Sequence, residues 1–156
     1  MNDMKTVYHV EGKLSKDFVG QISYTVCLEE TYEELDIEFS FGPQHFSPKD
    51  ITPELKERLL DYLKREYSLT PSSEEELEDA IYGQMKTEIH TMAALNDEFI
   101  GCIHRQLTTR HMHFTPKEAT EGCIPQPCIE GVLKVTVLAF SVLLDNTGYT
   151  LTVKVR

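Results

Sequence analysis

Two histidines and two cysteines lie close together in the segment 110–128, RHMHFTPKEATEGCIPQPC. They are His111, His113, Cys123 and Cys128, and nitrogen and sulfur donors of this kind are the usual ligands of a tetrahedral zinc ion. In an extended segment the two histidines would point to the same side, because side chains alternate along a strand. The cysteine spacing is less favourable, since four residues separate the pair and two of them are prolines. We therefore keep zinc binding as one hypothesis, beside the simpler one in which the cysteines pack and the histidines are exposed.

The other side chains that could do chemistry lack a partner at a useful spacing. Cys102 and His104 would diverge on a helix, because residues two apart do not face each other. Pairs such as Cys27 with His9 require a tertiary contact that spacing does not supply. The chain also has no glycine-rich turn between a strand and a helix that could hold a phosphate. The sequence therefore favours a protein without an enzymatic active site.

Acidic residues outnumber basic ones, 26 against 15, and give a formal net charge of −11. Up to Glu98 there are 22 acids against 9 Lys and Arg, and after it 4 against 6. A protein that binds nucleic acid or an anionic membrane needs a basic surface, so we expect neither partner. Solvation and the helix dipole explain the acidic runs at 29–38 and 74–79, which could otherwise imitate nucleic-acid charge in front of a basic protein.

The length and composition fit a single domain over 1–156. A chain of this length with 40% hydrophobic residues can bury a substantial core. Its first ten residues lack the basic start and apolar run of a signal peptide, and no apolar stretch reaches the length of a membrane span. We therefore expect a cytoplasmic protein whose four cysteines are reduced.

Two groups of strands are predicted from residues that alternate between apolar and polar. Near the N-terminus the pattern covers 6–14, 21–28 and 35–41, and the polar sequence EETYEE is predicted to link the last two as a hairpin. Near the C-terminus it covers 132–144 and 149–155, which the turn sequence DNTG is predicted to link as a second hairpin. We therefore expect three strands before the helices and two after them.

Three helical segments are predicted between the two groups. A threonine followed by a proline begins a helix over 53–66, where leucines recur at helical spacing. A serine with a glutamate three residues later begins a second helix. One apolar stripe continues it as a single long helix over 73–106, with a break at Asn96–Asp97 as the alternative. Another Thr-Pro pair predicts a short helix over 116–121.

These elements predict an α+β fold of two layers. A mainly antiparallel five-stranded sheet, in the chain order βββ-αα-short α-ββ, would have one long helix packed on one face. The other face would be exposed and polar, and would carry His9, Ser23, Thr25, Asp36, Glu38, Thr150, Thr152 and Lys154. Such a face could dock a protein partner or a second copy of the chain.

These features favour a non-enzymatic protein-interaction or regulatory module that forms a homodimer or binds another protein. No cofactor is expected unless zinc occupies His111, His113, Cys123 and Cys128. A further hypothesis is a small-molecule pocket between the sheet and the long helix, where two-layer folds often leave a cavity.

Overall fold

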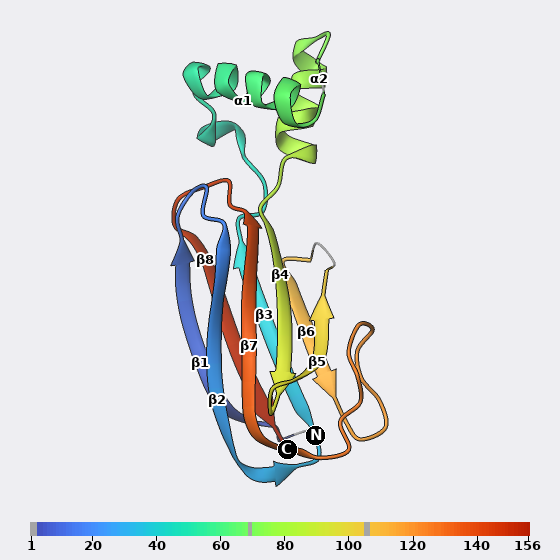
Figure 1. The fold of residues 1–156 in the computed structure, drawn as a ribbon. Coiled ribbons are helices and arrows are strands. Elements are labelled where there is room, and N and C mark those ends of the chain that lie inside the picture. Colours follow the sequence, from blue (N-terminus) through green and yellow to red (C-terminus); the bar gives the residue numbers. More distant parts are fainter. Residues whose placement is uncertain (1–2, 69, 105–106) are drawn as a thin grey trace.

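Eight antiparallel strands in two facing sheets form the body of the molecule (Figure 1). The computed structural model describes residues 3–68, 70–104 and 107–156. The strands are β1 (Lys5–Leu14), β2 (Gly20–Tyr32), β3 (Leu35–Gly42), β4 (Glu88–Leu95), β5 (Glu98–Ile103), β6 (Thr109–Phe114), β7 (Ile129–Ser141) and β8 (Thr147–Val155). Between β3 and β4 lie the helices η1 (Pro48–Asp50), α1 (Pro53–Glu66), α2 (Glu74–Asp79) and η2 (Ala80–Gln84). The predicted α+β class and antiparallel arrangement are confirmed.

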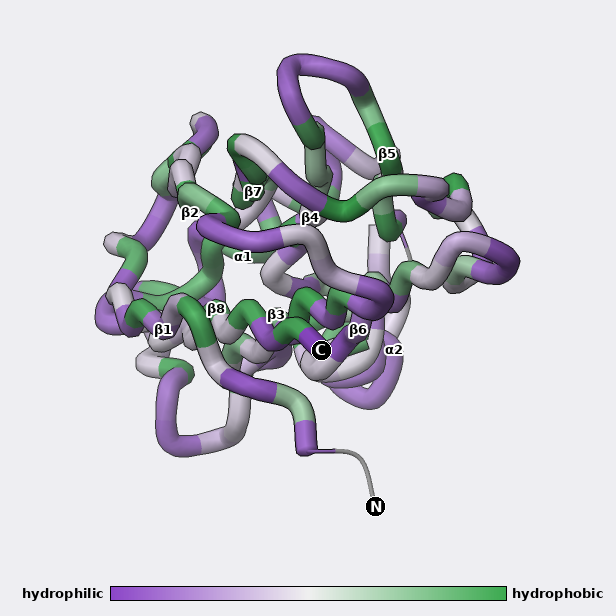
Figure 2. Tube along the Cα trace, turned by 90° about the horizontal axis from the view of Figure 1, so that it is seen from below, coloured by the Kyte–Doolittle hydropathy of each residue, from purple (hydrophilic) through white to green (hydrophobic). Residues whose placement is uncertain are grey.

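The strands are divided between two sheets. The first sheet has the order β1-β8-β3-β6 and the second has the order β2-β7-β4-β5. Figure 2, seen from below, shows them as two layers. Consecutive strands belong to different sheets at every step except that from β4 to β5. The prediction of one five-stranded sheet covered by a long helix is wrong, because each sheet covers the apolar inner face of the other.

Both predicted hairpins are crossings between the sheets. β2 pairs with β7 and β3 pairs with β8, so the EETYEE segment carries the chain from the second sheet to the first. The DNTG sequence does form a turn, in which Asn146 has a φ of 58° and the Lys16 N–H donates to the Asp145 carboxylate at 2.9 Å. After that turn, however, β8 joins the first sheet while β7 stays in the second. A turn sequence marks where the chain reverses and does not specify which strands then pair.

The predicted long helix over 73–106 is wrong. Only α2 and η2 are helical there, and the chain then forms the hairpin of β4 and β5. At its tip, Asn96 and Asp97 have φ values of 52° and 68°, the left-handed geometry that a tight hairpin turn requires. The last two residues of the predicted helix, Arg105 and Gln106, lie outside the described part of the chain. The inward positions of β4 follow a period of two and are Ile89, Thr91, Ala93 and Leu95.

The helix predicted over 53–66 is confirmed as α1. Its first turn is capped by Thr52, whose hydroxyl accepts a hydrogen bond from the Leu55 N–H at 3.2 Å. The proline that follows the cap suits the first helical position, where the missing N–H has no partner to lose. The cap and the leucine spacing therefore agree on both ends of this helix.

The short helix predicted over 116–121 is wrong. The Thr115 hydroxyl accepts from the Glu118 N–H at 2.9 Å, as at a helix start, but the backbone then turns back and Ala119 bridges to Phe114. The cap contact has closed a turn without starting a helix. Within the described residues, no helix has both the length and the apolar character needed to cross a membrane.

Two separate hydrophobic clusters stabilise the molecule. The larger one lies between the sheets, where Leu35, Phe114 and Leu133 are fully buried. The smaller one lies among the helices and consists of Phe46, Leu59, Leu63, Leu77, Ala80, Ile81 and Met85. We call the segment 43–87 the helical cap. Figure 1 shows the cap at one end of the sandwich and both chain termini at the other.

The helical cap joins the sandwich at a narrow neck. The Thr87 N–H donates to the Gln44 carbonyl at 2.7 Å, which brings the two ends of the cap together. The Thr87 hydroxyl, fully buried, accepts from the Leu143 N–H at 3.0 Å, just after β7. The neck is therefore held by a backbone hydrogen bond between its two ends and by the Thr87 side chain next to the end of β7, although the cap has a hydrophobic cluster of its own.

Candidate functional site

The structure places the four residues of the zinc hypothesis in different surroundings. His111 and His113 are neighbours on the outer face of β6. Cys123 packs against β5, where a Cβ on Gly101 would lie 2.5 Å from its sulfur, and the Cys128 thiol donates to Glu130 at 3.0 Å. Within the described residues, no three or more histidine, cysteine or acidic side chains form a group that could hold a metal ion.

The thiols of Cys102, Cys123 and Cys128 are poorly suited to metal binding or nucleophilic attack at neutral pH. Burial raises the pKa of Cys123 to about 11, and the neighbouring Cys102 adds to the rise. Burial also raises the pKa of Cys102, against the opposing effect of Arg110. At Cys128 the hydrogen bond to Glu130 raises the pKa. Because the thiolate is the reactive and metal-binding form, these shifts reduce both kinds of chemistry.

Instead of cysteines, the two histidines contact three acidic side chains, Asp36 and Glu38 on β3 and Glu34 just before it. Asp36 accepts from both, at 2.9 Å from His111 Nδ1 and 3.2 Å from His113 Nδ1. The Nε2 atoms point outward along the sheet, to Glu38 at 3.1 Å and to Glu34 at 2.9 Å. The histidines and carboxylates therefore alternate in a row of hydrogen bonds across β3 and β6, in which each ring contacts two carboxylates.

This row belongs to a polar surface that covers the outer side of the first sheet. The predicted exposed residues of β1, β3 and β8 all lie there, and they are His9, Asp36, Glu38, Thr150, Thr152 and Lys154. We call this surface the polar face. Two members of the prediction are misplaced, because Ser23 and Thr25 lie on β2 in the other sheet.

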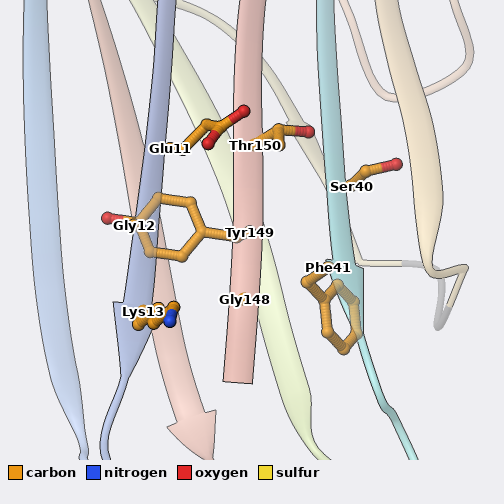
Figure 3. Close-up of a pocket in the computed structure, with 8 residues that line it drawn as sticks. All are labelled: Glu11, Gly12, Lys13, Ser40, Phe41, Gly148, Tyr149 and Thr150. Carbon is orange, nitrogen blue, oxygen red and sulfur yellow. The ribbon is translucent and has the colours of Figure 1, made fainter. Parts of the chain in front are cut away.

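A shallow hollow of about 680 Å³ lies across β1, β8 and β3 (Figure 3). No atom lies within 4 Å of the place where a Cβ of Gly148 would be, so the surface is open there. On the inner side the Tyr149 ring fills the space that Gly12 leaves, since a Cβ on Gly12 would lie 2.3 Å from the ring. The hollow is edged by Glu11, Lys13, Ser40 and Thr150. It is too open to enclose a ligand.

The outer side of the second sheet carries a group of apolar side chains on β4, β5 and β7, beside polar outward residues of β2 such as Ser23 and Thr25. We call it the apolar face and define it by Met92, Ala94, Phe99, Val132, Leu138 and Phe140. Three of these side chains are about half exposed, with fractions of 53% for Phe99, 45% for Val132 and 52% for Phe140. The segments that build the face contain a single acidic or basic residue, Lys134; they are 21–27, 90–94, 99–102 and 132–140.

Phe140 is held in position although half of it is exposed. Its ring centroid lies 4.6 Å from that of His90, and the His90 ring packs edge-on against His104 at 5.0 Å. Glu88 Oε1 lies 3.4 Å from His90 Nε2. A ring that is already fixed loses little conformational freedom when a partner covers it.

A groove of about 350 Å³ runs between α1 and the cap end of the sandwich, and we call it the cap groove. Its apolar lining includes Phe46, Leu55, Leu59, Met85, Phe140 and Val142. Lys16, Arg58 and Arg65 stand along it with a single acidic residue, Asp17. This replaces the pocket predicted between a sheet and a long helix, because the long helix does not exist.

The sequence contains signals for the cap groove and the apolar face that the periodicity of apolar and polar residues did not identify. Arg58, Tyr62 and Arg65 are four and three residues apart, which places them on one side of α1. On β7, Val132, Leu138 and Phe140 occupy the outward positions, where a finished surface would carry polar residues. Both signals depend on knowing which side of an element is covered, and that information comes from the fold.

The chain is thus an antiparallel β-sandwich with a helical cap, an architecture that serves many unrelated functions. Residues 4–156 match the model of a family of unknown function, DUF6669, and the chain belongs to this family. No curated protein and no solved structure matches it at a significant level. Membership of this family carries no activity with it, so function has to be argued from the two outer faces and the cap groove.

Proposed function

We propose that the protein is a non-enzymatic interaction module that forms a homodimer through its apolar face. The observation that carries this proposal is the half exposure of Phe99, Val132 and Phe140 on one side of one sheet. Half-exposed apolar side chains on one face of a sheet favour an interaction site. A four-stranded sheet offers it as a flat surface, and a two-fold axis brings the same surface of a second copy against it.

Charge favours a second copy at this face over any other part of the surface. Each chain carries a net charge of −11, so two copies repel each other wherever their acidic surfaces meet. Along 21–27, 90–94, 99–102 and 132–140 the apolar face carries only Lys134, and acidic residues of its strands, such as Glu88 and Glu130, lie at its ends. The polar face would instead bring the Glu34, Asp36 and Glu38 carboxylates of two chains into contact.

The test is the subunit number of matched variants. Val132→Glu places a carboxylate at the half-exposed edge of the apolar face, far along β7 from the cap. Thr6→Glu is the control, because it adds the same charge on the first sheet, at an exposed position opposite Lys154. Sedimentation equilibrium and native mass spectrometry should show a dimer for the wild type and for Thr6→Glu, and a monomer for Val132→Glu.

Two results would overturn the proposal. One is a wild type that remains monomeric at all concentrations, which would leave the apolar face for a different protein. The other is an equal loss of dimer in both variants, which would place the interface elsewhere. Unfolding curves recorded in parallel check that Val132→Glu is folded, and the native mass of the wild type also reports any bound metal.

A further inference from the structure

The cap groove shares Phe140 with the apolar face and is otherwise built from different residues. The turn between β1 and β2 forms one wall, fixed by the Asp17 N–H, which donates to the Val142 carbonyl at 2.9 Å. The other wall is α1, which presents Arg58, Tyr62 and Arg65 from one side. The end of β7 and the neck of the cap close the bottom with apolar side chains.

Positive charge is concentrated at this groove in a strongly acidic protein. Arg65 is paired with Asp61, at 3.3 Å, within α1. Arg58 and Lys16 also line the groove, and no carboxylate in the described part of the chain forms an ion pair with either side chain. Because Asp61 balances Arg65, two further cations, Lys16 and Arg58, face one acidic residue, Asp17, and the local charge of the groove is opposite in sign to that of the whole chain.

We propose that the cap groove binds a small amphipathic anion, in which a carboxylate, phosphate or sulfonate is carried on an aliphatic or aromatic body. The anionic group would lie at Arg58 and Lys16 on the rim, and the body would lie along the apolar floor formed by Leu55, Leu59 and Val142. A guanidinium binds such a group through two parallel hydrogen bonds. The volume of about 350 Å³ lies at the small end of the range for ligand pockets, roughly 300–1,000 Å³, and fits a body of a few apolar groups.

The chemistry of the lining excludes the simpler ligands. A neutral apolar molecule would leave the Arg58 and Lys16 charges without a partner beside it. A small inorganic anion would use those charges and leave the apolar floor of the groove in contact with water. Only a ligand with both parts uses both halves of the groove.

Isothermal titration of the full chain with three probes tests the proposal. Decanoate has both parts, decanol has the apolar part and inorganic phosphate has the charge. We expect decanoate to bind in a 1:1 ratio and the other two to bind at least about tenfold more weakly, since losing either half of the contact removes a large part of the affinity.

Two arginine and lysine variants supply the matched control. Arg58→Gln should weaken decanoate binding by about tenfold, because the charge-assisted hydrogen bonds at the rim are lost. Lys64→Gln removes the same charge from an exposed position of α1 outside the groove and should leave binding unchanged. Both substitutions are on the surface of the helix, so both proteins should fold.

Each other result overturns the proposal. No binding of decanoate shows that the groove is not such a site, and equal weakening in the two variants shows that the anion is held by overall charge. Decanol binding as tightly as decanoate shows that the cations play no part. Val132→Glu should bind decanoate like the wild type, so that failure of the dimer and failure of this site remain distinguishable.

Discussion

The outer faces of the two sheets were built from strands of similar length, yet they are different surfaces. On the polar face, Asp36 of β3 contacts His111 of β6, and Glu34, just before β3, contacts His113 and Arg156. On the apolar face the corresponding positions carry Met92, Leu138 and other apolar groups, with one lysine. The polar side chains of one face therefore contact each other, while the other face exposes the apolar side chains on which the proposed interface rests.

The largest expected difference between the two faces is in the loss of stability when an acidic residue is placed on each. Met92→Glu puts a charge among half-buried apolar groups at the centre of the second sheet and should lower the free energy of unfolding by about 2 kcal/mol. Thr6→Glu on the first sheet should change it by less than about 0.5 kcal/mol. Urea unfolding at a concentration where both variants are monomeric measures the two values. Equal losses in the free energy of unfolding would show that the two faces tolerate an added carboxylate equally well.

A second prediction compares two acids within the polar face. Glu34 is only 6% exposed and lies 2.6 Å from Arg156 Nη2 and 2.9 Å from His113 Nε2, so Glu34→Gln should cost about 1–2 kcal/mol. Glu38 is more exposed, and Glu38→Gln should cost less than about 0.5 kcal/mol. Thermal unfolding at neutral pH measures both. A larger effect at Glu38 would mean that burial does not set the strength of this row.

The smallest expected effect concerns thiol reactivity on the apolar face. Cys27 is exposed and lies opposite Val132 in the β2–β7 pairing, so dimerisation should slow its alkylation by iodoacetamide at pH 8 as protein concentration rises. Cys123 is the internal reference, because its pKa of about 11 keeps it a thiol and slow to react at any concentration. Mass spectrometry of the modified peptides follows both. In Val132→Glu the protection of Cys27 should disappear, and protection that persists there would contradict the proposed interface.

Local signals in the sequence predicted individual elements well. The helix at 53–66, the five strand segments and the turn at Asn146 are all present, because caps, alternation and turn residues act within a few neighbouring positions. The pairing of the strands was not predictable in the same way. It depends on contacts between distant parts of the chain, such as β2 with β7, that no local pattern encodes.

The wrongly predicted long helix over 73–106 and the apolar face have the same cause. The outward positions of β4 and β5 carry Met92 and Phe99, while an inward position carries Thr91. Apolar residues therefore occur on both sides of the hairpin, and their spacing resembles a helical stripe rather than a period of two. A strand that presents apolar residues outward departs from the usual pattern of a half-exposed sheet, and the proposed interface rests on that departure.

The candidate site was predictable only in part. His111 and His113 were correctly placed on one side of an extended segment, since alternation alone fixes that relation. Their partners Asp36 and Glu38 lie far away in sequence and become neighbours through the pairing of β3 with β6. The cap groove needs three separate segments to come together, and nothing in any one of them indicates the other two.

The neck of the cap allows the cap to vary without affecting the sandwich. The chain leaves the sandwich after β3 and returns to the same place before β4, where the Thr87 N–H meets the Gln44 carbonyl. Because the helical cap starts and ends at the same place, its length or sequence can change without moving any strand out of register.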